Sequence, residues 1–168
     1  MKYLLSTAFL LVAIFSLTSC GKDEPKQKQT ATATYNLSFS QDLLDACNVI
    51  ITYSAENGRN VMEPVTEPWW TKSITSDKFP AKFGVMYQFS TKSDAELVKE
   101  KYDLKGSLMI RIMTTNGASY SNTVSIIDAE GVAKNKVVST LNKQSGKSIG
   151  YSVSIDGNVT PANNMDYD

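Results

Sequence analysis

The chain has 168 residues, in which 17 Lys and Arg balance 17 Asp and Glu, and it contains no histidine. The balanced charge argues against nucleic acid as a partner, because phosphate binding needs a clustered excess of basic residues. Without histidine, Ser-His-Asp and Cys-His nucleophilic sites and HExxH zinc sites are excluded. The sequence therefore predicts no catalytic residue, no metal site and no cofactor.

The first 19 residues have the organisation of a cleaved signal peptide. Lys2 supplies a positive charge, and the apolar stretch over residues 4–17 is shorter than the roughly 20 residues that span a bilayer. The stretch ends in Leu17-Thr18-Ser19-Cys20, which resembles the lipobox of bacterial lipoproteins. The resemblance implies cleavage before Cys20 and lipid modification of its thiol, so that several acyl chains hold the protein to a membrane.

A charged run follows the predicted lipidation site directly, with Lys22, Asp23 and Glu24. This start resembles the surface lipoproteins of the Bacteroidetes, in which such a run accompanies display on the outer face of the outer membrane. The resemblance implies an outer membrane lipoprotein that faces the cell exterior. An ordinary solvated linker, with the protein on the periplasmic face, is the alternative.

The second cysteine, Cys47, has no partner for a disulfide if Cys20 carries lipid. It stands at the edge of an apolar run. The sequence therefore predicts a small buried side chain with a free thiol.

Composition divides the mature chain into three parts. Residues 20–34 carry no large aliphatic or aromatic side chain after the cysteine, so they cannot bury enough apolar area to order themselves and are predicted to form a flexible tether. Residues 35–160 are predicted to form a single β-rich domain. Residues 161–168 form a polar tail.

Strands dominate the predicted domain. Period-two alternation or β-branched runs predict strands at residues 35–39, 49–53, 60–75, 83–89, 108–112, 120–127 and 151–155. Asn57-Gly58 and Asn116-Gly117 are hairpin turn signals, because both residues of each pair tolerate positive φ. Pro64 and Pro68 cannot donate to a β-ladder, so they favour an edge strand or a bulge within 60–75.

Helical signals are few and short. Residues 42–46 are predicted to form a short helical turn or a crossing between strands. Ser93 and Glu96 are spaced as a capping box, which predicts a helix over 93–102. A second helix is predicted from Ala133 through Leu141, ending by Gly146.

This pattern favours a mainly-β fold, an antiparallel β-sandwich of about seven strands, immunoglobulin-like or transthyretin-like, with one or two short helices. The alternative is an α+β fold with an open antiparallel sheet and helices on one face. The mature part also resembles small uncharacterised Bacteroidetes lipoproteins in Trp70-Thr71-Lys72, in residues 80–84 and in Leu141-Asn142-Lys143 before residues 145–148. Since no activity is assigned to that group, the resemblance implies only location and fold.

Two adjacent tryptophans, Trp69 and Trp70, are the candidate ligand-binding residues. On an extended strand neighbouring residues face opposite sides, so one ring points inward and the other outward. Trp70 shares its face with Lys72 and Ile74, and because Ile74 favours burial, we predict that Trp70 faces the core and Trp69 is exposed. An exposed tryptophan can stack on a sugar or anchor a protein partner.

Two functions follow as hypotheses. The first is a non-catalytic, surface-tethered binding or accessory module that takes a glycan or an envelope protein. The second is a carboxylate-dependent glycoside hydrolase or another small extracytoplasmic enzyme, because glycoside hydrolysis needs two acids and no histidine.

Overall fold

The computed structural model describes residues 28–56, 58–94 and 96–162, which form two β-sheets packed on each other. Sheet A has four strands in the order β4-β1-β6-β7, and sheet B has five in the order β3-β2-β5-β8-β9. All neighbouring strands pair antiparallel. The predicted mainly-β sandwich is therefore confirmed, with more strands than expected, and the open-sheet alternative is wrong.

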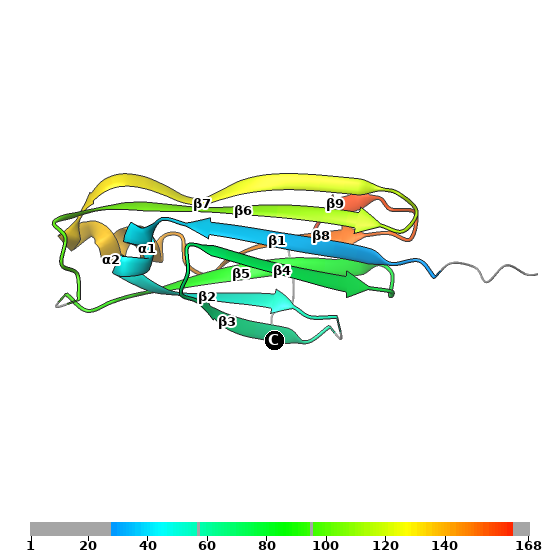
Figure 1. The fold of residues 1–168 in the computed structure, drawn as a ribbon, viewed down its shortest axis with the longest axis horizontal. Helices are drawn as coiled ribbons and strands as arrows, with labels where there is room; N and C mark the ends of the chain where they lie inside the picture. The colour runs from blue at the N-terminus through cyan, green and yellow to red at the C-terminus, as the bar shows by residue number, and fades with distance from the viewer. Residues whose placement is uncertain (1–27, 57, 95, 163–168) are drawn as a thin grey trace, which may run out of the picture.

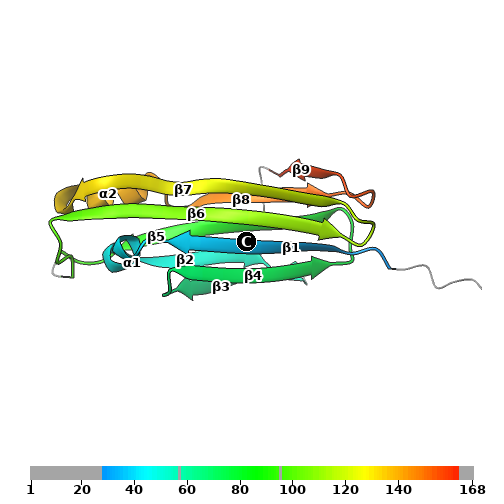
Figure 2. The same ribbon diagram turned by 45° about the horizontal axis from the view of Figure 1, so that its top comes forward.

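The elements follow each other along the chain as β1 (Ala31–Phe39), α1 (Gln41–Ala46), β2 (Cys47–Ser54), β3 (Asn60–Val65), β4 (Trp69–Ser76), β5 (Ala81–Thr91), β6 (Lys101–Thr114), β7 (Ser119–Ala133), α2 (Val137–Asn142), β8 (Lys147–Val153) and β9 (Val159–Pro161). In Figure 1 the strands of sheet A run side by side along the long axis, with β7 and β4 at its edges. Both α-helices lie at the same end of the molecule, opposite the start of β1, and Figure 2 shows them separated across that end (Figure 1 and Figure 2).

The first strand, β1, forms because its residues alternate strictly between buried and partly exposed positions. Ala31 and Ala33 are fully buried on the same face of β1 as Tyr35. The core-facing side of the strand therefore begins with two small side chains. Residues 31–34, which were predicted to belong to the tether, are therefore part of the sheet. The signal was missed because alanine alternating with threonine lacks the large apolar residues that mark a strand in sequence.

Residues 60–75 form two strands in different sheets, and the prediction of one interrupted strand is wrong. β3 pairs with β2 in sheet B, whereas β4 pairs with β1 in sheet A. Pro68 lies in the crossing between the sheets, where its carbonyl accepts a hydrogen bond from Phe39 N at 2.9 Å. Pro64 stands on β3 at the edge of sheet B, as the sequence predicted.

The helix predicted over residues 93–102 does not form at residues 93, 94 and 96–102, the part of this range that the structure describes. The capping interaction itself forms, since Ser93 N donates to Glu96 Oε2 at 2.9 Å, but only a turn follows. β6 begins at Lys101 and pairs with β7 as far as Ala133. Pairing between distant strands, which also buries Tyr102, therefore outweighs the local helix signal.

The remaining predicted elements agree with the structure in type, but three boundaries were wrong. The last predicted strand, 151–155, is β8 and ends at Val153, so that Ile155 lies in the following turn and is 57% exposed. The second helix begins at Val137 rather than Ala133, and Pro161, which was assigned to the tail, pairs with Tyr151 in β9. β6 and β7 form a hairpin around Gly117, which has a φ of 91°. α2 buries Val137 and Leu141 one turn apart, and Gly146 follows it with a φ of 77°.

The hydrophobic core fills the space between the two sheets. Its buried members among the described residues run from Ala31 to Val153. The leader, Cys20 and the tail after residue 162 lie outside the described residues. Within residues 28–56, 58–94 and 96–162, no helix has both the length and the hydropathy that a membrane span requires.

Candidate functional site

The two tryptophans occupy the first two positions of β4 and face opposite sides of sheet A. Trp69 is 76% exposed, whereas Trp70 is partly buried and packs against the core. Ile74, on the same face as Trp70, is 6% exposed. The predicted strand register is therefore confirmed: Trp70 points inward and Trp69 outward.

Trp70 lies in a polar cluster that closes the edge of the sandwich between β3 and β4. Its Nε1 donates to Glu63 Oε2 at 3.1 Å, and Lys72 Nζ donates to Glu63 Oε1 at 2.7 Å. The Tyr53 hydroxyl also donates to Glu63 Oε1, and the Tyr53 and Trp70 rings pack at a centroid distance of 5.6 Å. The hydrogen bonds from Lys72 and then Tyr53 hold the pKa of the Glu63 carboxyl below its ordinary value of 4.5.

This cluster gives Trp70 a structural role. Its indole N–H already has an acceptor and its ring already has an aromatic neighbour, so little of the side chain is available to a ligand. Of the two candidate ligand-binding residues, the structure leaves Trp69 as the one with an available ring. None of the hydrogen bonds between described residues uses Trp69 Nε1.

A row of serines crosses sheet A beside Trp69. In the strand register Trp69 is opposite Ser38, Ser38 is opposite Ser107, and Ser107 is opposite Ser125. These residues therefore share the outer face of the sheet, one on each strand. The Ser38 and Ser107 hydroxyls are hydrogen-bonded to each other at 2.8 Å.

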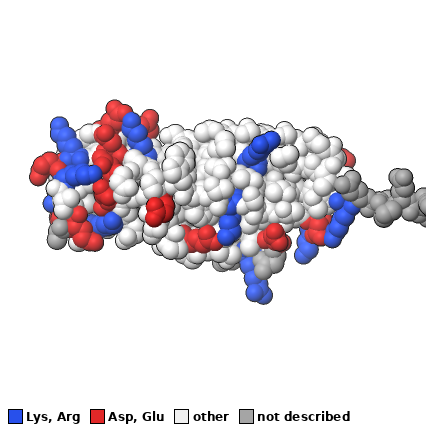
Figure 3. Space-filling model, in the orientation of Figure 1, with Lys and Arg blue, Asp and Glu red and all other residues white. Residues whose placement is uncertain are grey.

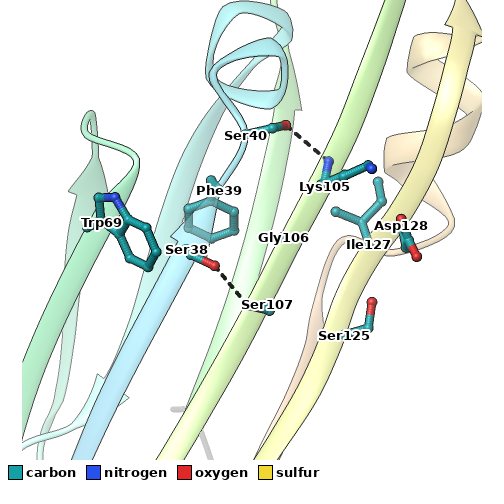
Figure 4. A pocket seen from close by; sticks show the side chains of 10 residues that line it. All are labelled: Ser38, Phe39, Ser40, Trp69, Lys105, Gly106, Ser107, Ser125, Ile127 and Asp128. Atoms are coloured by element: carbon teal, nitrogen blue, oxygen red, sulfur yellow. Dashed lines mark hydrogen bonds between the residues drawn. The ribbon is translucent and has the colours of Figure 1, made fainter.

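Because serine side chains are short, the row forms the floor of a depression of about 460 Å³ with the Trp69 ring at its side (Figure 4). The residues that line it come from all four strands of sheet A and from the turn after β1: Ser38, Phe39, Ser40, Trp69, Lys105, Gly106, Ser107, Ser125, Ile127 and Asp128. The depression is thus a shallow open surface site with an aromatic side and a hydroxyl floor.

A close packing contact lies beneath the depression. Phe39, on β1, is opposite Gly106 on β6, and a Cβ on Gly106 would stand 2.9 Å from Phe39 Cδ1 and 3.3 Å from Ile127 Cγ2. The register of β6 and β7 shifts at this point, between Gly106 and Ser107. Glycine is therefore required here for close approach, and the Phe39 ring supports the sheet under the serine row.

The outer face of sheet A is nearly uncharged beyond the serine row. Its successive rows are Thr71, Asn36, Met109 and Thr123, then Ser73, Thr34, Arg111 and Ser121, then Thr75, Thr32, Met113 and Ser119. Arg111 is the one charged residue in these rows. In Figure 3 charged side chains are sparse over the middle of the molecule and gather at the end that holds α1 and α2.

Two charged residues border the depression at its β6–β7 side. The Lys105 ammonium is paired with the Glu130 carboxylate. The Asp128 side chain, opposite Lys105 in the register, makes no hydrogen bond or ion pair with another described residue, although it interacts electrostatically with Lys105. Because Lys105 is ion-paired with Glu130, the two carboxylates share one ammonium and a net negative charge remains beside the depression.

Neither a protein-family model nor a curated protein matches this sequence.

Other reactive groups lie away from the depression. Cys47 is 1% exposed, and its Sγ donates to the Leu43 carbonyl at 3.2 Å. Burial raises the pKa of this thiol to about 12, so the reactive thiolate is strongly disfavoured. This confirms the predicted burial of Cys47.

No group of three or more His, Cys, Asp or Glu residues suited to a metal ion occurs in the part of the chain that the structure describes.

Sequence reasoning identified Trp69 but missed Ser38, Ser107, Ser125 and Asp128. These four residues come from three strands, and nothing in their local sequence distinguishes them from other polar residues of a solvent-facing strand. Only the strand order and register bring them beside Trp69. The two carboxylates that a glycoside hydrolase needs are not paired here, because Asp128 is the single acid among the described residues that line the depression.

Proposed function

We propose that this protein is a lipid-anchored, non-catalytic glycan-binding module displayed at the outer face of the outer membrane. The observation that carries the proposal is the 76% exposure of Trp69 beside a depression of about 460 Å³ on the outer face of sheet A, whose base is formed by serine side chains. Binding sites for small ligands are concave and combine aromatic side chains with a few placed polar groups, and the depression beside Trp69 has this composition.

The chemistry of the depression supports a sugar rather than an apolar ligand. A sugar ring presents an apolar C–H face, which packs on an aromatic ring, and a rim of hydroxyl groups, which exchange hydrogen bonds with short polar side chains. Trp69 provides the first surface, and Ser125 and Asp128 provide the second. An apolar partner would leave the Ser125 hydroxyl and the Asp128 carboxylate without hydrogen bonds, which is costly when they lose contact with water.

The position of the depression supports display away from the membrane. Ala31 starts β1, and Ser38, beside Trp69, comes seven residues later, which corresponds to roughly 23 Å along an extended strand. The predicted tether joins the domain at the Ala31 end, so the glycan site lies toward the opposite end. Because the predicted tether is flexible, it does not fix the orientation of the domain, but it leaves this end of the sheet free to face away from the membrane.

The predicted anchor has a direct test in cells. Replacement of Cys20 by serine is expected to abolish labelling by a fatty-acid probe and to move the protein into the soluble fraction. Protease added to intact cells is expected to cleave the wild-type protein. Retention of the label and of the membrane fraction in the Cys20→Ser variant would contradict the anchor, and full protection from protease would contradict display on the outer face.

Glycan binding is tested with the chain from Gly21 to Asp168 on a glycan array, followed by calorimetry on the glycans retained. We expect Trp69→Ala to weaken binding by about 1 to 3 kcal/mol, within the range for loss of one aromatic contact at a binding site. Met62→Ala is the matched control, since Met62 is 62% exposed but lies on sheet B. Glycans recovered without cleavage support a binding module, and released products would support the hydrolase instead.

A further inference from the structure

The depression extends beyond the reach of one sugar ring on Trp69. Trp69 stands on β4 and Ser125 on β7, at opposite edges of the four-stranded sheet A. With neighbouring strands about 4.8 Å apart, the three spacings between β4 and β7 amount to roughly 14 Å. A single ring stacked on the indole therefore leaves the β6 and β7 side of the depression empty.

Hydrogen-bonding groups continue across that distance. The Ser38 and Ser107 hydroxyls pair with each other in the middle. Ser125 and Asp128, at the far side, make no hydrogen bond with another described residue through their side chains. Figure 4 shows the Trp69 ring on one side of the depression and the side chains of Ser125 and Asp128 on the other, with the serine pair between them. Partners for sugar hydroxyls are thus present at both sides of the sheet.

The charge at the far side selects among glycans. A carboxylate accepts hydrogen bonds from two neighbouring sugar hydroxyls and repels a uronic acid, a sialic acid or a sulfate group. Lys105 does not offset this repulsion fully, because its ammonium is paired with Glu130. The net negative charge that Asp128 leaves beside the depression therefore favours uncharged sugars.

We infer that the depression binds a neutral oligosaccharide of more than one sugar, which crosses the strands of sheet A from Trp69 to Asp128. The inference rests on the proposed function and adds to it a minimum ligand length, a direction and a charge preference. Since β4 and β7 are both edge strands of sheet A, the site has no neighbouring strand of that sheet at either side. The site can therefore bind an internal segment of a longer oligosaccharide as readily as its end.

The test is a calorimetric series with the chain from Gly21 to Asp168. The probes are neutral linear gluco-, manno- and N-acetylglucosamine oligosaccharides, from monomer to hexamer, and galacturonic acid oligomers of equal length. For the neutral series that binds, the affinity is expected to rise about tenfold or more between monomer and trimer and then to level off. Uronic acid oligomers are expected to bind at least about tenfold more weakly than neutral oligomers of equal length.

Asp128→Asn tests the charge preference, because it keeps the shape and removes the charge. This variant is expected to weaken neutral binding about tenfold while reducing the discrimination against uronic acids. Asp156→Asn is the matched control, because it removes the same charge at the turn after β8. The affinity for neutral oligosaccharides and the discrimination against uronic acids should both stay at their wild-type values in this variant.

The outcomes separate the inference from the proposed function. If no neutral or acidic oligosaccharide binds the wild-type protein, the proposed function fails and the inference fails with it. If a monomer binds as tightly as a trimer, or uronic acids bind better, while Trp69→Ala still weakens binding, the glycan site stands and the inference is wrong.

Discussion

Trp70 donates its indole N–H to the Glu63 carboxylate, with Nε1 and Oε2 3.1 Å apart, and this hydrogen bond separates the roles of the two adjacent tryptophans. It ties β4 of sheet A to β3 of sheet B at the open edge of the sandwich. Because Trp70 is committed to the fold, its neighbour Trp69 is held with its ring in solvent. The structural residue thus positions the exposed one.

The first prediction concerns the stability ranking of the two tryptophans. Trp70→Ala is expected to lower the free energy of unfolding by about 3 kcal/mol, at the low end for truncation of a large aromatic because Trp70 is only partly buried. Trp69→Ala is expected to change it by less than about 0.5 kcal/mol, since an exposed side chain makes few contacts. Urea denaturation measures both values. The opposite ranking would mean that the strand register is shifted by one residue.

The second prediction concerns acid stability. The pKa of Glu63 is lowered in the folded protein, so its contribution is complete above the ordinary value of 4.5 and is lost as the pH falls below it. Glu63→Gln is therefore expected to cost about 1 kcal/mol of unfolding free energy at neutral pH and less at about pH 3, where the carboxylate is increasingly protonated in both states.

A second variant identifies the source of this pH dependence. The hydrogen bond from Lys72 is the largest cause of the lowered pKa of Glu63, so Lys72→Met should remove much of the same pH dependence. Denaturation curves at both pH values provide the comparison. An equal cost of Glu63→Gln at the two pH values would show that the carboxylate charge has no part in stability.

The third prediction concerns the contact beneath the depression. Gly106→Ala places a methyl group 2.9 Å from Phe39 Cδ1, so we expect a loss of about 1 to 2 kcal/mol from overpacking. The double variant Gly106→Ala, Phe39→Leu should recover part of that loss, because the smaller side chain makes room. A double-mutant cycle measures the coupling. Additive losses would show that the two residues do not contact each other.

The fourth prediction concerns the thiol of Cys47. In the chain from Gly21 to Asp168 it is the sole cysteine, and a bulky maleimide is expected to react slowly with the native protein and rapidly in urea. The reason is burial, which both blocks access and disfavours the thiolate. Rapid labelling of the native protein would show that Cys47 is accessible.

Much of the fold could be predicted from the sequence, because strands that bury one face place large apolar residues at every second position. Phe83 and Val85 in β5 are an example. The errors arose where local signals compete with distant pairing. Ser93 and Glu96 form their capping contact, yet the chain joins β6 instead of a helix. Around Pro68 the sequence gives no sign that the chain changes sheets, because the residues on both sides have strand character.

The candidate site was predictable only in part. Trp69 was identified because adjacent residues on a strand face opposite sides and Ile74 fixes which side is buried. The serines and Asp128 could not be identified, since their proximity to Trp69 depends on the order of four strands. The pairing of β6 with β7 also shifts by one residue between Gly106 and Ser107, so that Ile126 has no partner. The outward-facing positions of β7 therefore do not follow one alternation before and after Ile126, and no local sequence pattern indicates this shift.

The most direct test of glycan capture by Trp69 is tryptophan fluorescence in the Trp70→Phe variant, in which Trp69 is the sole tryptophan. Phenylalanine retains an aromatic ring against Tyr53, so the fold should persist with a modest loss of stability. Titration with the neutral oligosaccharides that calorimetry shows to bind is expected to shift the emission to shorter wavelength, because the sugar removes water from the exposed indole. The affinity obtained from this shift is expected to equal the calorimetric affinity. Unchanged emission at saturating ligand, with binding still present by calorimetry, would place the glycan elsewhere and contradict the account.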